Sequence, residues 1–433
     1  MRLPIALAGL LFAVSTAAAL EPPAYLLAPD DAYAWSAKTT TRLEGAEVTV
    51  LRLTSQKWQG KTWRHWMHVV RPDEVAHTGT ALFLIAGGST SKDEPRAMTP
   101  EVAVLREVAI RTRSTLIVLS QVPNQPLFDG KSEDAIIAHT FAKFLETGDE
   151  SWPALLPMTK SAMRGMDAAQ AFLKERYRQD VGKFVVTGAS KRGWTTWMTA
   201  AFDPRVAAIA PMVIDTLNFP RQMKLQVESF GDYSDQIGDY TALNLPEKLK
   251  TAEGKRLVEL VDPHVWRERF TMPKLIVLGT NDRYWPVDAL KVYLGDLPGE
   301  TLVHYVPNAG HGLGPGAVEA IASWYMNLLE GRERPKFTWE TCTEEGCCTT
   351  TLVCAGKPVR VELWRAASET RDFRNSRWTC EPLELKDGRV SACVDHPDAG
   401  WIAWHIRVTW DGPLGQEYAL CTNVETAGAP AGK

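Results

Sequence analysis

Residues 183–197, KFVVTGASKRGWTTW, predict a strand, a tight turn and a helix in direct succession. Residues 184–187 are all β-branched or aromatic, which is typical of a strand, whereas the residues after the turn are compatible with a helix. Ser190 lies in the turn, between Gly188 and Gly193. A sharp turn of this kind lifts a hydroxyl clear of the sheet, and the following helix N-terminus offers N–H groups to a developing oxyanion. Ser190 is therefore a candidate nucleophile at the carboxyl end of a strand.

The glycine spacing departs from the nucleophile-elbow pattern G-x-S-x-G, because one extra residue precedes Gly193. A glycine-rich turn in which Ser190 only caps the helix is the structural alternative. The choice depends on which other reactive side chains the chain places at the same edge of the sheet.

The rest of the chain up to about residue 331 alternates between buried strands and helices. Continuous apolar runs are typical of strands buried on both faces. Such strands are predicted at 80–86, 114–120, 206–214, 274–279 and 301–306, with helices at 101–112, 155–177 and 318–329. This alternation predicts a doubly wound, mostly parallel α/β sheet. Residues 216–271 interrupt it with sparse apolar residues and no clear strand, which predicts an inserted helical cap.

Two further strand ends carry candidate catalytic side chains. Asp282 follows the strand at 274–279, and His311 follows the strand at 301–306. The order Ser190, Asp282, His311 is that in which the α/β-hydrolase fold supplies nucleophile, orienting acid and general base. A neutral imidazole can take the serine proton and return it to the leaving group, while a buried carboxylate fixes its tautomer. The sequence therefore predicts a Ser-His-Asp triad.

Each member of this triad has an alternative. Asp282 could begin a turn with Asn281, and His311 could be an ordinary loop residue between two glycines. Asp215 is a rival acid, because it follows the strand immediately after the Ser190 turn.

Residues near the triad are candidates for stabilising the oxyanion and for binding the substrate. The oxyanion donors are expected to be the backbone N–H of Lys191, directly after the nucleophile, and that of Gly88, in the turn after an early strand. Four neighbours are candidate substrate-binding residues: Arg192, Trp194, Arg283 and Trp285. The two guanidinium groups would suit a carboxylate on the substrate, although Arg192 could equally brace the turn in a buried ion pair. The tryptophans could form an apolar or sugar-stacking wall, with Trp194 alternatively in the core.

Composition narrows the class of protein. The chain has 433 residues, 45% of them hydrophobic, which is typical of a globular protein with more than one domain. A formal net charge of -4 and the lack of a basic run give no reason to expect a nucleic-acid partner. Residues 1–19 combine Arg2, an apolar run and small residues, which predicts a cleavable signal peptide and a secreted or periplasmic protein. A retained membrane anchor is the alternative, and no later stretch is long and apolar enough to span a bilayer.

The C-terminal part differs from the rest. All seven cysteines lie beyond residue 340, and short strands separated by turns are predicted within 337–425, after a linker at 332–336. In an exported chain this pattern predicts a disulfide-stapled β-sandwich-like domain. A zinc site is the alternative, but the paired spacing of zinc ligands is missing, so neither a metal nor a cofactor is expected.

Four ordered blocks carry a resemblance to a known family: VTGASKRGWTTW, DTLNFPRQMKLQVESFGDYSDQIGDYTALNLP, GTNDRYWPVDALKVYLGDLPGE and VPNAGHGL. They resemble the PhoPQ-activated pathogenicity-related proteins, a group of secreted or envelope-associated α/β-hydrolase-like proteins, from about residue 30 to about 330. The resemblance implies the α/β-hydrolase fold, which we expect over 20–331, and a triad of Ser190, Asp282 and His311.

Two classes of function follow. The first is a secreted serine hydrolase without a cofactor, acting on a small-molecule or envelope-derived ester in preference to a peptide. The second is a binding or signalling protein that keeps the fold with little or no turnover.

Overall fold

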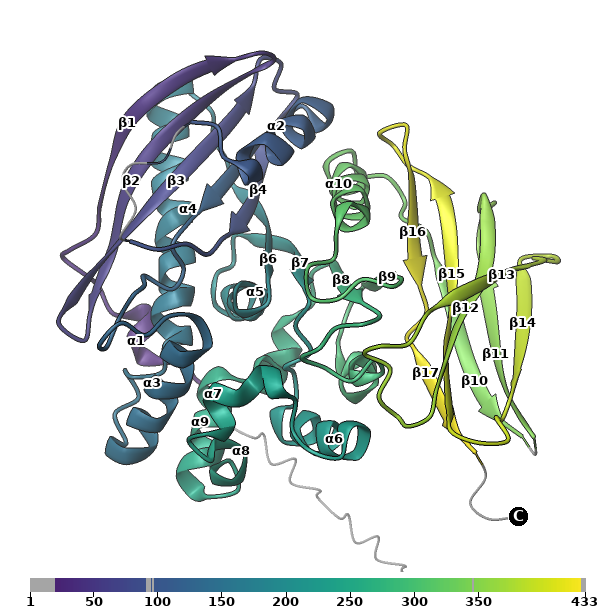
Figure 1. Cartoon of the computed structure of the whole chain (residues 1–433). Coiled ribbons are helices and arrows are strands. Elements are labelled where there is room, and N and C mark those ends of the chain that lie inside the picture. The colour runs from purple at the N-terminus through teal and green to yellow at the C-terminus, as the bar shows by residue number, and fades with distance from the viewer. Residues whose placement is uncertain (1–19, 91–94, 96, 345, 430–433) are drawn as a thin grey trace, which may run out of the picture.

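The computed structural model describes residues 20–90, 95, 97–344 and 346–429. The predicted signal peptide at 1–19 lies outside these residues. A mixed sheet of nine strands forms the centre of the N-terminal part, in the order β1-β2-β3-β5-β4-β6-β7-β8-β9 (Figure 1). The strands are β1 (Ala34–Leu43), β2 (Ala46–Trp58), β3 (Lys61–Pro72), β4 (His77–Ile85), β5 (Ser114–Leu119), β6 (Lys183–Ala189), β7 (Val206–Met212), β8 (Lys274–Gly279) and β9 (Thr301–Val306).

Pairing within this sheet changes from antiparallel to parallel along its width. β1, β2, β3 and β5 pair antiparallel, whereas every pair from β5 through β4 to β9 is parallel. The parallel strands are those that the continuous apolar runs predicted, and β5 and β8 are buried along their whole length. The prediction of a mostly parallel α/β sheet is confirmed.

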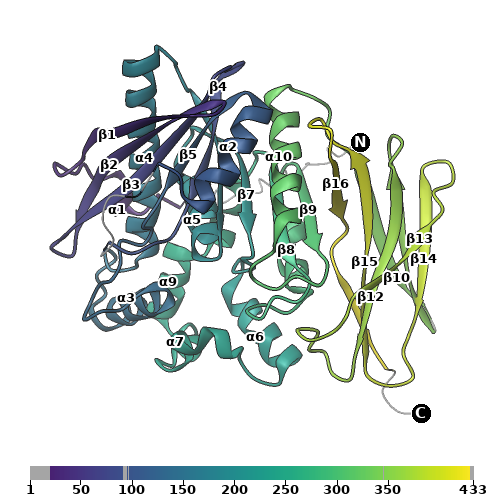
Figure 2. The same cartoon turned by 45° about the horizontal axis from the view of Figure 1, so that its top comes forward.

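Helices cover both faces of the sheet. One face packs against α2 (Pro100–Thr112) and α10 (Pro315–Leu329), which lie in front of the sheet in Figure 2. The other face packs against α4 (Leu155–Tyr177) and α5 (Lys191–Phe202). Neighbouring residues of β4 point to opposite faces, since Leu82 packs with the first pair of helices and Phe83 with the second.

A group of short helices lies at the carboxyl end of the parallel strands, where the sequence predicted a cap. It contains α6 (Phe219–Phe230), η1 (Asp235–Ile237), α7 (Gly238–Thr241), α8 (Leu245–Lys248), α9 (Ala252–Val261) and η2 (Pro263–Arg269). α3 (Glu133–Thr147) contacts α7, α8 and α9, so the cap closes against a helix of the main domain (Figure 1). Three smaller helices complete the set: α1 (Ala24–Leu27), η3 (Ala289–Val292) and η4 (Leu294–Asp296).

The C-terminal part is built from two antiparallel sheets. One has the order β10-β11-β14, and the other has the order β13-β12-β15-β16, with β17 also paired to β15. Their bounds are β10 (Phe337–Thr343), β11 (Cys347–Cys354), β12 (Arg360–Ser368), β13 (Thr379–Leu383), β14 (Arg389–Asp395), β15 (Trp401–Asp411), β16 (Glu417–Cys421) and β17 (Glu425–Gly428). Inward residues of both sheets, such as Leu352 and Ile406, share one core.

The cysteines of this part are all described, and each is a free thiol in the structure. No disulfide bond joins them, so the disulfide-stapled framework that the sequence led us to expect is not shown. Cys348, Cys354 and Cys421 are buried, whereas Cys380 is exposed on the second sheet. Only the thiols of Cys347 and Cys393, on adjacent strands, interact closely enough for the contact to raise the pKa of Cys393.

The C-terminal part packs directly onto the main sheet. β16 lies beside β9 in Figures 1 and 2, and the buried ring of His304 on β9 hydrogen-bonds through Nδ1 to the carbonyl of Ala419 on β16, at 2.7 Å. A long connection between β12 and β13 extends from the sandwich to the loops that follow β8 and β9. One hydrophobic core therefore includes residues of both parts, Cys421 and Tyr305 among them.

Candidate active site

Ser190 sits in a strained turn between β6 and α5. Its backbone angles are φ 58° and ψ -125°, a left-handed conformation that costs a non-glycine residue of the order of 1–3 kcal/mol. The turn is held by the hydrogen bond from the N–H of Ser190 to the carbonyl of Met212, at 2.9 Å. The side chain does not cap the helix, so the capping interpretation of Ser190 is not supported by the geometry.

The two glycines around Ser190 allow close packing of α5 against the strands. A Cβ on Gly188 would lie 2.7 Å from the carbonyl oxygen of Arg192, and a Cβ on Gly193 would lie 2.6 Å from the side chain of Ile214. Gly193 therefore allows α5 to pack closely against the end of β7 and the residues that follow it. This contact accounts for a glycine one residue later than the G-x-S-x-G pattern requires.

Substituting Gly188 tests this packing. We expect Gly188→Ala to lower the free energy of unfolding by about 1–3 kcal/mol, because the new methyl group overlaps backbone atoms that cannot move away. Gly182→Ala is the matched control, since a Cβ there meets no atom within 4 Å. Thermal unfolding of both variants measures the difference, and equal melting temperatures would contradict the packing argument.

His311 and Asp282 lie side by side at the ends of β9 and β8. Nδ1 of His311 is 2.8 Å from Oδ2 of Asp282, and Oδ1 of the same carboxylate accepts a hydrogen bond from the N–H of Tyr284, also at 2.8 Å. Asp282 is buried, with 7% of its surface exposed. Because an ionised carboxylate can only accept, the proton of the neutral imidazole is placed on Nδ1, which leaves Nε2 free to act as a base.

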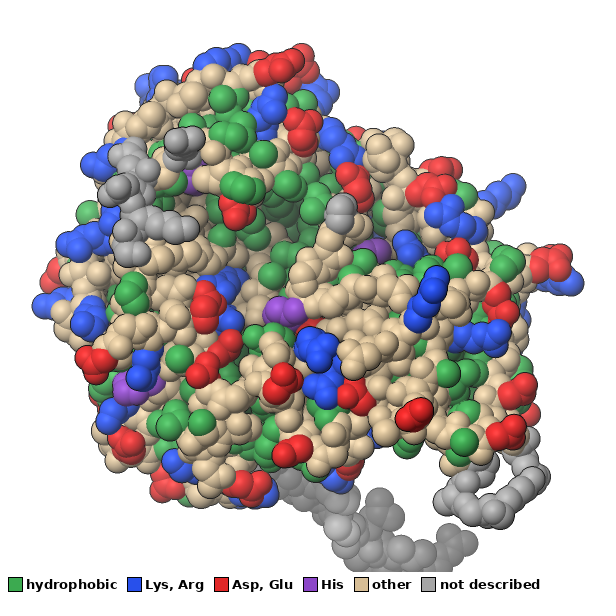
Figure 3. Space-filling model, in the orientation of Figure 1, with side chains coloured by type: hydrophobic (Ala, Val, Ile, Leu, Met, Phe, Trp, Pro, Cys, Tyr) green, Lys and Arg blue, Asp and Glu red, His purple; other side chains and the backbone are tan. Residues whose placement is uncertain are grey.

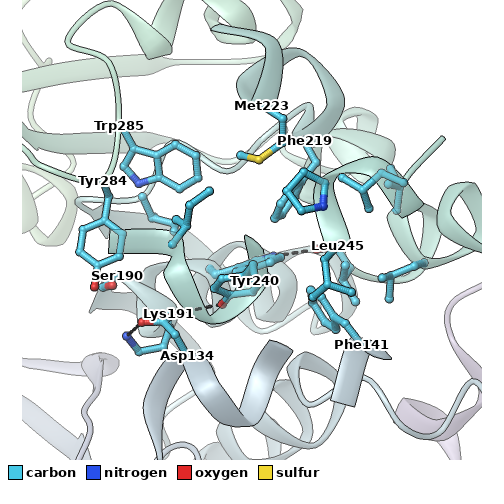
Figure 4. Close-up of a pocket in the computed structure, with 18 residues that line it drawn as sticks. Asp134, Phe141, Ser190, Lys191, Phe219, Met223, Tyr240, Leu245, Tyr284 and Trp285 are labelled. Atoms are coloured by element: carbon cyan, nitrogen blue, oxygen red, sulfur yellow. Dashed lines mark hydrogen bonds and ion pairs between the residues drawn. The ribbon is translucent and has the colours of Figure 1, made fainter. Parts of the chain in front are cut away.

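Nε2 of His311 is buried and has no hydrogen-bond partner among the described residues. Ser190 also makes no side-chain hydrogen bond to it in the described structure, so the pair is not engaged here. The ring of Tyr284 packs on that of His311 with centroids 4.3 Å apart, and Figure 4 shows the same Tyr284 ring next to Ser190. Serine and histidine therefore flank one tyrosine, and hydrogen bonds between catalytic groups commonly tighten only when substrate binds.

Asp215, the rival acid, has a different partner. Its carboxyl group is fully buried behind the end of β7, where Oδ1 accepts a hydrogen bond from the hydroxyl of Tyr293 at 2.6 Å. Burial, opposed by the hydrogen bond from Tyr293 and assisted by the charge of Asp282, raises the pKa of Asp215 to about 7. A carboxyl group that is half protonated at neutral pH is poorly suited to stabilise an imidazolium.

Arg192 connects the serine turn to the neighbouring loops. Its Nη1 and Nη2 each lie 2.7 Å from an oxygen of Glu133, and its Nε donates to the carbonyl of Val122 at 2.6 Å. The guanidinium group passes against Gly87, where a Cβ would lie 2.5 Å from Nη2. Although burial opposes ionisation, hydrogen bonds and charge from Arg192 lower the pKa of Glu133 to about 2, so Glu133 stays ionised at neutral pH.

The expected oxyanion donors lie on adjacent turns. Ile85 at the end of β4 pairs in register with Gly188 at the end of β6, so the Gly87-Gly88 turn and the Ser190 turn leave the sheet next to each other. Gly88 has φ 124°, a conformation that L side chains rarely adopt. The N–H of Lys191 belongs to the first residue of α5, where intrahelical acceptors are lacking.

A pocket opens beside Ser190 and continues under the cap. Figure 4 shows Ser190 and Tyr284 at one end of it and Phe141 and Leu245 toward the other. Trp194 and Trp285 both line the pocket, and the indole N–H of Trp194 donates to the carbonyl of Val261 at 2.7 Å.

The two arginines predicted to bind substrate are not among the described residues that line this pocket. Arg192 is occupied by Glu133, and Arg283 hydrogen-bonds through Nη1 to Oδ1 of Asn375 in the C-terminal part, at 3.2 Å. Neither guanidinium group is therefore placed to pair with an acidic group inside the pocket.

Several residues of the site were not predicted from the sequence. Glu133 and Asp134 begin α3 and hold the two cations that follow Ser190: Lys191 Nζ lies 2.7 Å from Oδ2 of Asp134. Asn281 and Asn308 anchor the acid and base loops to the C-terminal part. The acidic first turn of α3 is a recognisable sequence signal, but the asparagines have none apart from their position beside Asp282 and His311.

The described residues contain neither a metal-binding cluster nor a membrane-spanning helix. No cluster of three or more His, Cys, Asp or Glu side chains suited to a metal ion occurs within them. In the same part of the chain, no helix has both the length and the hydropathy that a bilayer-spanning segment needs.

The fold and the order of the site residues define an α/β-hydrolase-type protein. Acetyl xylan esterase 1 from Thermoanaerobacterium sp. JW/SL YS485 has a similar structure, with a TM-score of 0.50 and 15% sequence identity over 71% of this chain and 91% of that one. An acetyl xylan esterase from Paenibacillus sp. R4 aligns with a TM-score of 0.49 and 13% identity, over 72% of this chain and 92% of that one. At such identities the likeness shows the fold alone.

The chain belongs to the family of PhoPQ-activated pathogenicity-related proteins, whose family model matches residues 23–374. A relative in this comparison is autocrine proliferation repressor protein A of Dictyostelium discoideum. It is 31% identical over 449 residues, which cover 94% of this chain and 90% of that protein. The family resemblance found in the sequence is therefore confirmed.

Proposed function

We propose that the protein is an exported serine hydrolase that transfers an acyl group from a carboxylic ester to water. The observation that supports this most directly is the pairing of His311 Nδ1 with Asp282 Oδ2 at 2.8 Å, next to a strained serine turn. This arrangement leaves Nε2 of His311 without a partner and available for a serine proton. Backbone strain and unpaired buried nitrogens are retained mainly where a function needs them.

The proposed reaction has two halves. Oγ of Ser190 attacks the ester carbonyl carbon and its proton passes to Nε2 of His311. The bond to the alcohol oxygen then breaks, and the alcohol leaves with that proton. Water repeats the sequence on the acyl-enzyme, releasing the acid and restoring Ser190. Asp282 orients the imidazole throughout, and the N–H groups of Lys191 and Gly88 stabilise the carbonyl oxygen as it gains charge.

An ester is favoured over a peptide as the first substrate to test. The acetyl xylan esterase that shares the fold is by its name an ester hydrolase. The predicted signal peptide would export the protein, so that an envelope-derived or extracellular ester would be within reach. No cofactor is needed for this chemistry.

A fluorophosphonate probe tests the proposal. We expect stoichiometric labelling of the purified protein, because only an activated serine attacks the phosphorus centre. Ser190→Ala should abolish the label while leaving the circular dichroism spectrum unchanged. Labelling that survives in Ser190→Ala would show that another residue is the nucleophile.

A binding or signalling protein without turnover is the second candidate. It is favoured by the missing hydrogen bond between Ser190 and His311 in the described structure, and by the name of the Dictyostelium relative, which is a proliferation repressor. Under this hypothesis the well-folded protein would not react with the probe at all.

A further inference from the structure

We propose that the pocket under the cap holds the acyl group of the substrate and selects an apolar acyl chain over a short or acidic one. This inference rests on the proposed function, because it assigns a substrate class to the same serine. It concerns the helices α3, α5, α6, α8 and α9, whose side chains meet around the pocket in Figure 4.

The walls of the pocket are almost entirely apolar. Met223 and Phe219 come from α6, Leu245 from α8, Leu257 from α9 and Phe141 from α3. The cavity between these side chains has a volume of about 50 Å³. Since one water molecule needs roughly 10–15 Å³ on this measure, the cavity admits a chain of a few non-hydrogen atoms.

The charged groups of the pocket neutralise one another near the serine end. Asp134 accepts hydrogen bonds from Lys191 Nζ at 2.7 Å and from the hydroxyl of Tyr240 at 3.0 Å. Burial, together with the charge of Asp134, raises the pKa of Tyr240 well above its ordinary value, so this hydroxyl remains a neutral donor. No other charged side chain is among the described residues that line the pocket. A carboxylate on the acyl chain would therefore be buried without a partner.

The position of the pocket makes it a site for the acyl group. Ser190 lies at one end, so a chain attached to the attacked carbonyl carbon can extend between the cap helices toward Phe141 and Leu245. Each methylene buried there is removed from water, which is favourable by up to about 0.8 kcal/mol.

A matched series of p-nitrophenyl esters tests the inference, because all of them release the same alcohol. We expect kcat/KM to rise by about 3-fold per methylene, which gives roughly 80-fold from the acetate to the hexanoate. The monoester of adipic acid has the same length as the hexanoate but ends in a carboxylate, and its kcat/KM should be lower by about 100-fold or more. If the acetate or the adipate monoester is hydrolysed as well as the hexanoate, the inference is wrong although the proposed function stands.

Two substitutions on one helix locate the effect. Met223→Trp on α6 fills the pocket and should lower the ratio of hexanoate to acetate kcat/KM by about 10-fold or more. Val227→Trp is the matched control, because Val227 lies one turn further along α6, is 41% exposed and does not line the pocket. An unchanged ratio in Met223→Trp, with normal folding, would place the acyl chain elsewhere.

A binding measurement keeps the inference testable without turnover. Octanoate should bind to Ser190→Ala protein in a calorimetric titration with a negative heat-capacity change, and Met223→Trp in the same background should weaken this binding by about 10-fold. Octanoate that fails to bind would overturn the inference. Failure of the proposed function is distinguishable, because it would appear as a lack of fluorophosphonate labelling whatever octanoate does.

Discussion

Replacing Asp282 with Asn should reduce kcat of ester hydrolysis by about 10,000-fold while leaving the fold intact. The amide cannot stabilise the imidazolium, and it can hold His311 in the wrong tautomer by donating to Nδ1. The hydrogen bond from the N–H of Tyr284 survives, because the remaining amide oxygen can accept it. Steady-state kinetics of the variant, with circular dichroism as a check on folding, measure the effect.

Asp215→Asn is the control, because Asp215 lies behind the neighbouring strand end. We expect a change in kcat of less than about 10-fold, since the hydroxyl of Tyr293 can still donate to the amide oxygen. A large loss of kcat in Asp215→Asn together with a small loss in Asp282→Asn would show that Asp215 is the acid of the triad.

The same control variant should change how stability depends on pH. The raised pKa of Asp215, about 7, means that the folded protein binds this proton between about pH 4 and 7, whereas the unfolded chain does not. Its contribution to stability is therefore favourable at low pH and is lost as pH rises through about 7. Asp215→Asn lacks this ionisation, so its melting temperature should fall less between pH 5 and pH 8 than that of the wild type.

The sheet could be predicted from sequence because its strands carry a strong local signal. Runs such as KLIVLG at β8 are buried on both faces, so every residue is apolar or has an aliphatic stem, and no other element shows this pattern over so few residues. The helical cap was predicted from the loss of that pattern. The sequence also favours a helix over 139–146, whereas α3 begins at Glu133, because its first turn of charged residues is fixed by pairing with Arg192 and Lys191, which lie far along the chain.

The candidate site was only partly predictable from the sequence, because part of it is determined by contacts between residues that lie far apart along the chain. Chain order placed Ser190, Asp282 and His311 at one edge of the sheet, and the structure brings Asp282 and His311 into contact. The side chains of Arg192 and Arg283 hydrogen-bond to Glu133 and Asn375, respectively, and no local sequence pattern reveals these partners. The apolar pocket likewise depends on how the cap helices pack, which a sequence without clear periodicity does not specify.

The C-terminal part and the hydrolase part are expected to unfold as one unit. Nδ2 of Asn281, beside the candidate acid, donates to the carbonyl of Ser376 at 2.7 Å. Asn308, three residues before His311, bonds to both backbone groups of Trp378, at 2.8 and 3.0 Å. Removing the C-terminal part would leave these amides unpaired and would expose the buried ring of Tyr305.

A chain that ends at Arg332 should therefore fail to give a cooperative thermal transition and should not react with a fluorophosphonate. A truncated chain can lose its fold for reasons other than the loss of these hydrogen bonds, so point variants of the contact are needed as well. Asn308→Gly preserves the left-handed backbone at φ 58° and removes only the side chain. Combined with Asn281→Ala, it should lower kcat by about 10-fold or more, because the loops that carry Asp282 and His311 lose their anchors.

The matched control for this double variant is Arg365→Ala, which breaks an exposed ion pair, 3.4 Å long, between Arg365 on β12 and Glu381 on β13. Exposed pairs of this kind contribute about 0–1 kcal/mol, so activity and melting temperature should stay close to the wild type. A truncated chain that melts cooperatively and still labels at Ser190 would show the opposite of what the contacts imply. The sandwich would then be an independent domain, as the linker at 332–336 first suggested, and the asparagine contacts would have no part in holding the acid and base loops.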